Sequence, residues 1–201
     1  TASDGAGGDN FGQSVAMSDT HIVVGAFYDD NGRGSVYVYN TDGTGEQKIT
    51  ASDAAINDNF GYRVAINSTK IFVGATGNDD AGSVYVYNLD GTGEQKITAS
   101  DGAAGDAFGI SVAISDTHIV VGAYGDDDSG SFSGSAYVYN LDGTGEVKLT
   151  ASDGASNDQF GYSVAVSDTK VVVGAWYDDD AGNDSGSAYV YNLDGTGEVK
   201  I

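Results

Sequence analysis

The sequence predicts an all-β fold, a β-propeller array whose blades are four-stranded antiparallel sheets. Three observations lead to this prediction. The 201-residue chain repeats one pattern four times, and each repeat holds four short apolar segments rich in Val, Ile and Tyr. The 31 glycines are spread along the chain, and no long 3.6-residue periodicity favours helix. Repeats of about 50 residues with four strand segments each are typical of propeller blades.

The repeat units can be marked by their recurring Thr-Ala-Ser. They are residues 1–49, 50–97, 98–149 and 150–201, taken together as a single array over residues 1–201. In the third unit the expected strands, in order, lie in residues 110–115, 118–124, 134–140 and 146–152. A short SDT turn joins the first two. An Asp-Gly turn in NLDGTGE joins the last two and is typical of a tight hairpin. The nearly continuous apolar runs predict sheets that are covered on both faces.

Positions that recur in every unit are expected to build the blades. The recurrent phenylalanines are Phe11, Phe60, Phe108 and Phe160. We expect each to wedge between neighbouring sheets, followed by a glycine that allows a close approach or an unusual backbone conformation. The tyrosines of the YVY segments, such as Tyr137 and Tyr139, are expected to pack on the next blade with their hydroxyls reaching solvent.

The pattern FG-x-S-V-A, V-V-G-A, D-D and G-S-x-Y-V-Y resembles the FG-GAP repeat of integrin α-subunit propellers. It is closer still to the bacterial variety with SDGAAGDAFG and GDDDSG loops. The resemblance covers all four units. It implies a propeller of a secreted or cell-surface protein that acts in adhesion, or in recognition of protein or glycan, rather than in catalysis.

Two departures from that family pattern limit what the resemblance implies. The chain has no proline, so the GAP letters read GAF, GAT, GAY and GAW. Integrin-type repeats also carry a D-x-D-x-D-G calcium loop between the first two strands, where this chain has only SDT or NST. At most one carboxylate remains in each of these turns, so calcium is not expected there.

Composition excludes several classes of function. The 30 acidic against 8 basic residues give a formal charge of −22, which excludes nucleic acid and anionic membrane surfaces as partners. No apolar run is long enough for membrane insertion. Without cysteine there is no disulfide, thiolate metal site or cysteine nucleophile. His21 and His118 are replaced by Lys70 and Lys170 in the other units, so we predict no catalytic residue. A glycosidase pair among the many aspartates stays a minor alternative.

The acidic side chains are expected to gather on one face of the array. Alternating connections place nineteen of the 30 acids on the face formed by the longer loops, where Arg33 is the only base within the loops. Most of these aspartates are expected to cap turns. No cofactor is required. The alternative is a hard cation such as Ca²⁺, with candidate ligands Asp126, Asp128, Asp178 and Asp180.

A ligand site is better sought where the units differ. After the VGA letters the units read Phe27-Tyr28, Thr76-Gly77, Tyr124-Gly125 and Trp176-Tyr177. Aromatic rings beside carboxylates suit a sugar ring or a cationic side chain. The candidate ligand-binding residues are therefore Tyr124, Trp176, Tyr177, Asp178, Asp180 and Asp184. The alternative is that Trp176 only fills the gap left by the absent proline.

Four blades pose a closure problem, since unpaired end blades expose apolar faces and strand edges. We expect a homodimer in which two chains join head to tail in an eight-bladed ring with twofold symmetry. A closed four-bladed monomer and a fragment of a longer array are the alternatives. The even number of whole units also fits an excised or engineered array. Beyond a second copy, the expected partner is a protein or glycan, or none if the array is purely structural.

Overall fold

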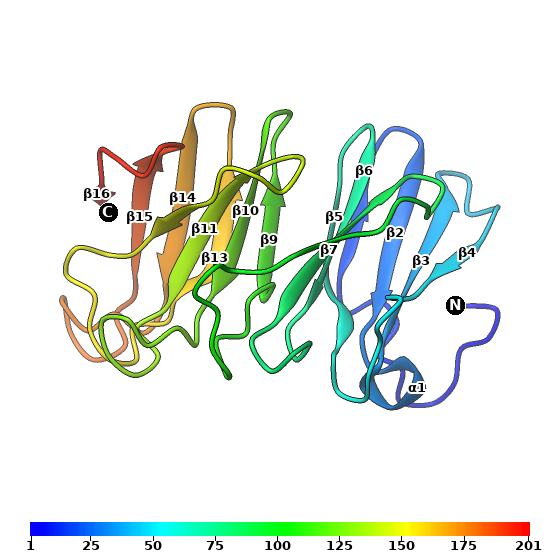
Figure 1. Cartoon of the computed structure of the whole chain (residues 1–201), viewed down its shortest axis with the longest axis horizontal. Coiled ribbons are helices and arrows are strands. Elements are labelled where there is room, and N and C mark those ends of the chain that lie inside the picture. Colours follow the sequence, from blue (N-terminus) through cyan, green and yellow to red (C-terminus); the bar gives the residue numbers. More distant parts are fainter.

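The computed structural model describes residues 1–201, which form four antiparallel four-stranded sheets (Figure 1), here named blades 1 to 4. Blade 1 consists of β1 (Val15–Met17), β2 (His21–Ala26), β3 (Ser35–Asn40) and β4 (Gln47–Ile49). Blade 2 consists of β5 (Phe60–Ile66), β6 (Lys70–Ala75), β7 (Ser83–Asn88) and β8 (Gln95–Ile97). Blade 3 consists of β9 (Ser111–Ile114), β10 (His118–Ala123), β11 (Ser135–Asn140) and β12 (Val147–Leu149). Blade 4 consists of β13 (Phe160–Val166), β14 (Lys170–Ala175), β15 (Ser187–Asn192) and β16 (Val199–Lys200). The predicted all-β class and the predicted four-stranded blades are confirmed.

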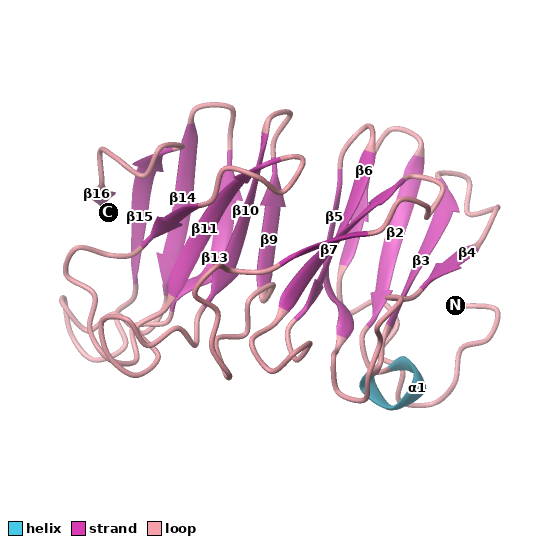
Figure 2. Cartoon of the chain, in the orientation of Figure 1, coloured by secondary structure: helices cyan, strands magenta, loops and turns pink.

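Strand order within each blade follows chain order, so every pairing joins neighbours in the sequence. The only helical segment is α1 (Asp29–Gly32), and it is a turn rather than a regular helix, because Asp30 and Asn31 have positive φ. Figure 2 shows that strands make up nearly all of the regular structure. No helical segment is long and apolar enough to cross a bilayer.

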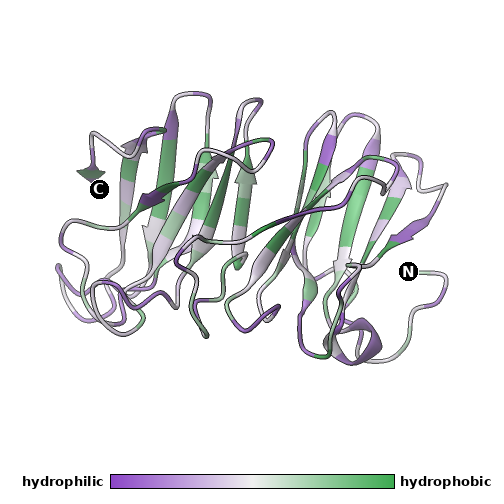
Figure 3. Cartoon of the chain, viewed as in Figure 1, coloured by the Kyte–Doolittle hydropathy of each residue, from purple (hydrophilic) through white to green (hydrophobic).

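The hydrophobic cores lie between the blades, one at each junction. Along β6, for example, Phe72 packs in the core shared with blade 3, whereas Ile71 and Val73 pack in the core shared with blade 1. This alternation follows from the strand period of two, and it explains why the second and third strands of the inner blades read as unbroken apolar runs. Figure 3 shows these hydrophobic bands along the strands and the hydrophilic loops at their ends.

Three of the four recurrent phenylalanines lie in these junction cores, as predicted, whereas Phe11 is partly exposed and belongs to none of the cores. Phe60, Phe108 and Phe160 are at most 1% exposed. Each is also bridged by backbone contacts to the preceding blade, in the pairs Gly34 with Phe60, Gly82 with Phe108 and Gly134 with Phe160. The wedge therefore combines apolar burial with a fixed backbone link between sheets.

The four blades fan around a common axis with their first strands innermost. A hollow of about 270 Å³ is lined by residues from β5, β9 and β13 and by Ser14 and Val15 of blade 1. Blades 1 and 4 extend to opposite sides of this axis in Figure 1, with the two termini at opposite ends of the molecule. No hydrophobic core joins blade 4 to blade 1.

Candidate functional site

The longer connections of all four blades lie on one side of the array, the lower edge in Figure 1. We name this side the loop face; it comprises the connections from the second to the third strand of each blade and from the fourth strand to the next blade. The short turns lie on the opposite side, named the turn face. Most aspartates lie on the loop face, as the alternation of connections predicted.

One lysine from the last strand of each blade reaches the loop face. These lysines are Lys48, Lys96, Lys148 and Lys200. The Nζ atom of Lys148 lies 2.6 Å from a carboxylate oxygen of Asp101 and 2.9 Å from one of Asp126, and it also pairs with Asp128. Lys200 makes the same three-way contact in blade 4, whereas Lys48 and Lys96 each hold two aspartates. Each lysine thus ties together the two loops of its own blade.

A tyrosine of the third strand completes each of these clusters. The hydroxyl of Tyr137 donates to Asp101 at 2.9 Å and to Asp126 at 3.0 Å. The ammonium of Lys148 lies 5.4 Å from the centroid of the same tyrosine ring, a cation–π contact. The expectation that the YVY hydroxyls reach solvent was therefore wrong. The first tyrosine of each YVY segment points toward aspartates of the loop face, whereas the second, such as Tyr139, bonds a hairpin glutamate or a backbone carbonyl.

Two of the clusters have the donor set of a metal site. The carboxylate oxygens of Asp101, Asp126 and Asp128 lie within 4.8 Å of one another, and so do those of Asp153, Asp178 and Asp180. Oxygen donors of this kind fit a hard cation. The four candidate ligands named from sequence do come together, in two separate groups. Sequence reasoning missed their third members, Asp101 and Asp153, and the lysines that supply the positive charge.

The charges around Lys200 alter how Asp178 titrates. Burial alone would raise the pKa of Asp178, but hydrogen bonds from Lys200 and Tyr189 outweigh burial and lower that pKa to about 2. Similar hydrogen bonds lower the pKa of Asp4 and Asp153, with the lysine bond the largest cause in both. Burial raises the pKa of Asp106 and Asp158, which have no such partner.

Acid is therefore expected to destabilise the fold. A carboxyl whose pKa is lower in the folded state adds stability above its unfolded pKa, and this stability is lost as pH falls through the folded pKa. For Asp178 that window runs from the ordinary aspartate pKa of 3.8 down to about 2. Urea denaturation at a series of pH values should show the free energy of unfolding falling across this window. Asp106 and Asp158 act in the opposite direction, so a stability that rises on acidification would show that they dominate instead.

Many other acidic side chains of the chain cap turns, which confirms the prediction for them. The Asp106 carboxylate accepts from the backbone N–H of Ala103 at 2.7 Å, three residues earlier. On the turn face, the Asp142 carboxylate accepts from the N–H and hydroxyl of Thr144. Both contacts recur in the other blades. Much of the acidic surface thus has a structural role.

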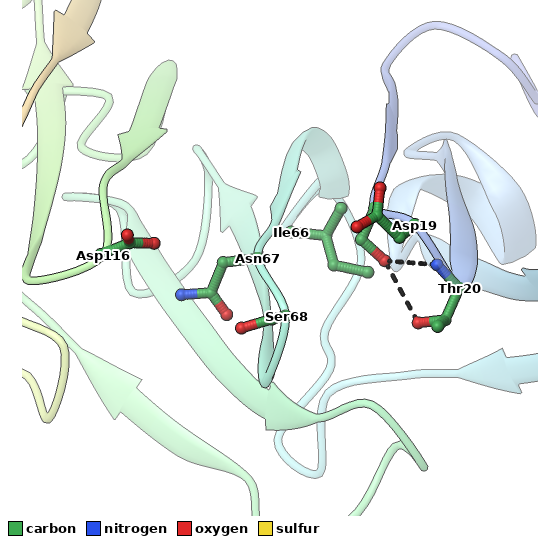
Figure 4. Close-up of a pocket in the computed structure, with 7 residues that line it drawn as sticks. Asp19, Thr20, Ile66, Asn67, Ser68 and Asp116 are labelled. Carbon is green, nitrogen blue, oxygen red and sulfur yellow. Dashed lines mark hydrogen bonds between the residues drawn. The ribbon is translucent and has the colours of Figure 1, made fainter.

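A hollow on the turn face has little chemistry of its own. It measures about 380 Å³ and is lined by the short turns of three blades, including Asp19, Asn67 and Asp116 (Figure 4). Figure 4 shows Asp19 and Asp116 on opposite sides of it. These turns occupy the position of the integrin-type calcium loop, and no cluster of three ligand side chains forms there.

A continuous row of aromatic rings crosses the loop face of blades 3 and 4. We name it the aromatic row; its members are Phe132, Tyr124, Tyr162, Trp176 and Tyr177. Successive ring centroids are 6.3, 5.7, 5.0 and 4.0 Å apart. Trp176 is 48% exposed and Phe132 is 42% exposed. The row therefore leaves aromatic surface open to solvent, and a shorter cluster of Phe27, Tyr28 and Tyr62 lies at the junction of blades 1 and 2.

Polar groups flank the aromatic row at Trp176. The indole Nε1 donates to the Gln159 side-chain oxygen at 2.7 Å, which fixes the ring. Beside it lies a hollow of about 370 Å³, lined by Ser156, Asn157, Gln159, Tyr177, Asp179 and Asp184. Aromatic surface next to hydroxyl, amide and carboxylate groups is the composition of a site that binds a small polar ligand.

The six ligand-binding candidates named from sequence divide into two groups. Tyr124, Trp176 and Tyr177 belong to the aromatic row, and Asp184 lines the adjoining hollow. Asp178 is only 2% exposed and, like Asp180, is paired with Lys200. The first four residues form one open surface, whereas the last two stabilise the loop behind it.

Sequence reasoning missed Tyr162, Phe132 and Gln159. The signal for Tyr162 was present, because the residue after the FG letters differs between units and reads Gln13, Tyr62, Ile110 and Tyr162. Tyr162 lies in a strand pattern, and it joins Tyr124 of blade 3 to Trp176 of blade 4.

Comparison with known protein families agrees with the repeat architecture. The model of the FG-GAP repeat matches the chain four times, at residues 1–39, 44–87, 92–139 and 144–191. No curated protein is similar enough to the chain to be matched. FG-GAP propellers are often used in binding or recognition, are generally non-catalytic and are typical of extracellular or cell-surface proteins. Since the four matches span most of the sequence, the chain belongs to the FG-GAP repeat family.

Proposed function

We propose that this propeller is a non-catalytic recognition module of a secreted or cell-surface protein, and that the aromatic row binds an uncharged carbohydrate. The observation that carries the proposal is the exposed Trp176, held in place by Gln159 beside a polar hollow. A sugar ring has an apolar face that stacks on aromatic rings and hydroxyls that bond to carboxylates and amides. An uncharged glycan is favoured over an anionic one because the formal charge is −22.

The contacts of the row support binding more than gap filling. Trp176 exposes 48% of its surface, so much of the indole is open to a ligand. The indole rests on Tyr162 and Tyr177 at centroid distances of 5.0 and 4.0 Å. Stacked and hydrogen-bonded rings lose little conformational freedom when a ligand binds, which favours affinity.

Calcium is not needed for this proposed site. In both aspartate triads a lysine ammonium already lies against the carboxylates, so Ca²⁺ would have to displace Lys148 or Lys200. We expect millimolar Ca²⁺ to leave the melting temperature of the protein unchanged. A clear rise of the melting temperature would show instead that the ion does displace the lysines.

The glycan proposal is tested with soluble neutral polysaccharides, including dextran, mannan and galactomannan, in affinity electrophoresis and by fluorescence of Trp176, the sole tryptophan. At least one should retard the protein and shift the emission. Trp176→Ala should weaken binding about tenfold or more, as expected for a stacked aromatic anchor. Ile56→Ala is the control, because Ile56 is an apolar side chain that is 58% exposed and belongs to no aromatic cluster.

The competing functions predict different results. A purely structural array would give no retardation with any polysaccharide. A module for basic protein segments would bind polylysine with strong salt dependence and ignore the neutral polysaccharides. Either result would contradict the glycan proposal.

A further inference from the structure

The three junctions between blades repeat one set of contacts. The backbone N–H of Phe60 donates to the Arg33 carbonyl, that of Phe108 to Ala81, and that of Phe160 to Ser133, at 2.9 to 3.2 Å. In each junction, a side chain of the second strand also packs into the core shared with the next blade. These side chains, Val23, Phe72 and Val120, are all 0% exposed. The junction is therefore a defined pairing of two unlike surfaces, one from the preceding blade and one from the following blade.

Blade 4 presents the first of these surfaces with nothing against it. We name it the tail face; it comprises Val172, Ala188, Val190 and Ile201, the equivalents of Val23, Val36, Val38 and Ile49 in blade 1. Val172 is 36% exposed and Ile201 is 74% exposed, whereas their equivalents in blade 1 are at most 5% exposed. The Ser185 carbonyl occupies the position of the Arg33 carbonyl and accepts no backbone hydrogen bond.

Blade 1 presents the second surface, equally uncovered. We name it the head face; it comprises Phe11, Ile22, Tyr39 and Gly43. The first three are partly exposed, whereas their equivalents in blade 2, Phe60, Ile71 and Tyr87, are at most 2% exposed. The N–H of Phe11 donates no backbone hydrogen bond, unlike that of Phe60. Side chains of the preceding blade cover the hairpin glycines Gly91, Gly143 and Gly195, but a Cβ built on Gly43 would meet nothing within 4 Å.

We infer that the head face of this chain binds the tail face of a second copy, and that two such contacts close the array into a ring of eight blades. The occupant follows from continuity, because the same pair of surfaces already packs together three times within the chain. The tail face cannot reach the head face of its own chain, since blades 1 and 4 extend to opposite sides of the axis (Figure 1). Two copies related by a twofold axis would satisfy both open faces at once.

Closure would also give polar groups of both faces the hydrogen bonds that the internal junctions already contain. The Ser111 hydroxyl of blade 3 donates to the Gly161 carbonyl of blade 4 at 2.8 Å. Ser163 is its equivalent in blade 4, is exposed, and would donate to Gly12 of the second copy. Gln13 of the second copy would then lie at the edge of Trp176, where Tyr162 lies against Tyr124. This inference does not depend on what the aromatic row binds.

A glycine of the second strand supplies a selective test. A Cβ added to Gly25, Gly74 or Gly122 would collide with the backbone carbonyl of Gly61, Gly109 or Gly161 in the next blade. Gly174 is their equivalent in blade 4, and a Cβ added there meets only the Ser163 side chain, which can rotate away. Gly174→Ala is therefore expected to fold normally and to block ring closure.

The measurement is sedimentation equilibrium of the 201-residue chain at micromolar concentrations, with circular dichroism to verify folding. The wild-type protein should have twice the chain mass of 20.5 kDa. Gly174→Ala should have the single-chain mass, as should a second variant, Val172→Asp. Ile56→Asp is the control and should stay dimeric, because Ile56 is 58% exposed on a loop away from both faces. A wild-type mass of one chain, a polymer larger than two chains, or a fully dimeric Gly174→Ala would each overturn the inference.

Discussion

Replacing Phe108 by alanine is expected to lower the free energy of unfolding by about 3 to 5 kcal/mol, the usual cost of truncating a buried phenylalanine. Phe108 is 0% exposed, and its ring lies edge-on to Tyr137 and Tyr139 at centroid distances of 5.4 and 6.2 Å. It belongs to the core that joins blade 2 to blade 3. Because small domains have only about 5 to 15 kcal/mol of stability in total, this loss is a large fraction.

The position of Phe108 adds a second expectation. In a repeat array each unit contacts only its neighbours, so weakening the middle junction uncouples one pair of blades from the other. Urea unfolding is followed by far-ultraviolet circular dichroism, which reports on all blades, and by fluorescence of Trp176, which reports on blade 4. The two transitions should coincide in the wild-type protein and separate in Phe108→Ala.

Phe132→Ala is the control for this experiment. Phe132 is also a phenylalanine but is 42% exposed and lies outside the junction cores. Its loss should cost less than about 1 kcal/mol, as for most surface substitutions. If both variants lost the same stability, the wedge role of the recurrent phenylalanines would be refuted.

The recurrent phenylalanines also show why so much of the fold was predictable. Four copies of one pattern separate what every blade needs from what varies, so the sequence alone predicted strands, turns and the wedge at Phe60, Phe108 and Phe160. Local sequence signals sufficed to predict the blades because strands that are neighbours in the sequence pair with each other within each blade. The junction cores then follow from alternation along each strand.

The electrostatic clusters of the loop face were not predictable in the same way. Acidic residues were assigned to a face by the loops that carry them, and Lys148 was overlooked because it lies in a strand. Its long side chain extends from β12 to loops that are 20 and 47 residues away in the sequence. Likewise, the run Asp178 to Asp180 gave no hint that its first member is buried. Asp178 turns inward, where its carboxylate accepts hydrogen bonds from Tyr189 and Lys200.

The candidate ligand surface was only half predictable. Divergence between units led to Tyr124 and Trp176, because a position that varies among otherwise identical blades is free of the packing that all blades share. Tyr162 was not found, since nothing in one strand pattern shows which ring it will meet on another blade. The row is a property of the junction between blades 3 and 4 and needs the three-dimensional structure to be seen.

Replacing Lys148 by methionine is the second change with a large expected effect, a loss of about 3 kcal/mol in the free energy of unfolding. Removing one partner of a buried ion pair typically costs about 3 to 5 kcal/mol. The Asp126 side chain is only 5% exposed, so its charge would be left buried and unpaired. The loss is expected at the lower end of that range because the side chains of Asp101 and Asp128 are 44% and 59% exposed and stay hydrated. The measurement is urea denaturation at neutral pH.

Two further variants locate the cause of that loss. Lys70→Met is the matched control, since the Lys70 ammonium donates to the Asn88 side chain and pairs with no carboxylate, so it should cost less than about 1 kcal/mol. Asp126→Asn in the Lys148→Met background should restore part of the stability by removing the buried charge. Blade 2 offers a precedent, because Asn78 occupies the position of Asp126 there.

Calcium distinguishes a lysine clamp from a metal site in the same variant. Without the ammonium, the carboxylates of Asp101, Asp126 and Asp128 remain within 4.8 Å of one another and carry three uncompensated charges. Millimolar Ca²⁺ is therefore expected to raise the melting temperature of Lys148→Met, because a ligand that binds only the folded state stabilises it. Equal stabilisation of Lys70→Met would contradict this, because the intact Lys148 in that variant should exclude the ion. Lys148 would then not exclude Ca²⁺ from the triad, and the role of the triad would be metal binding.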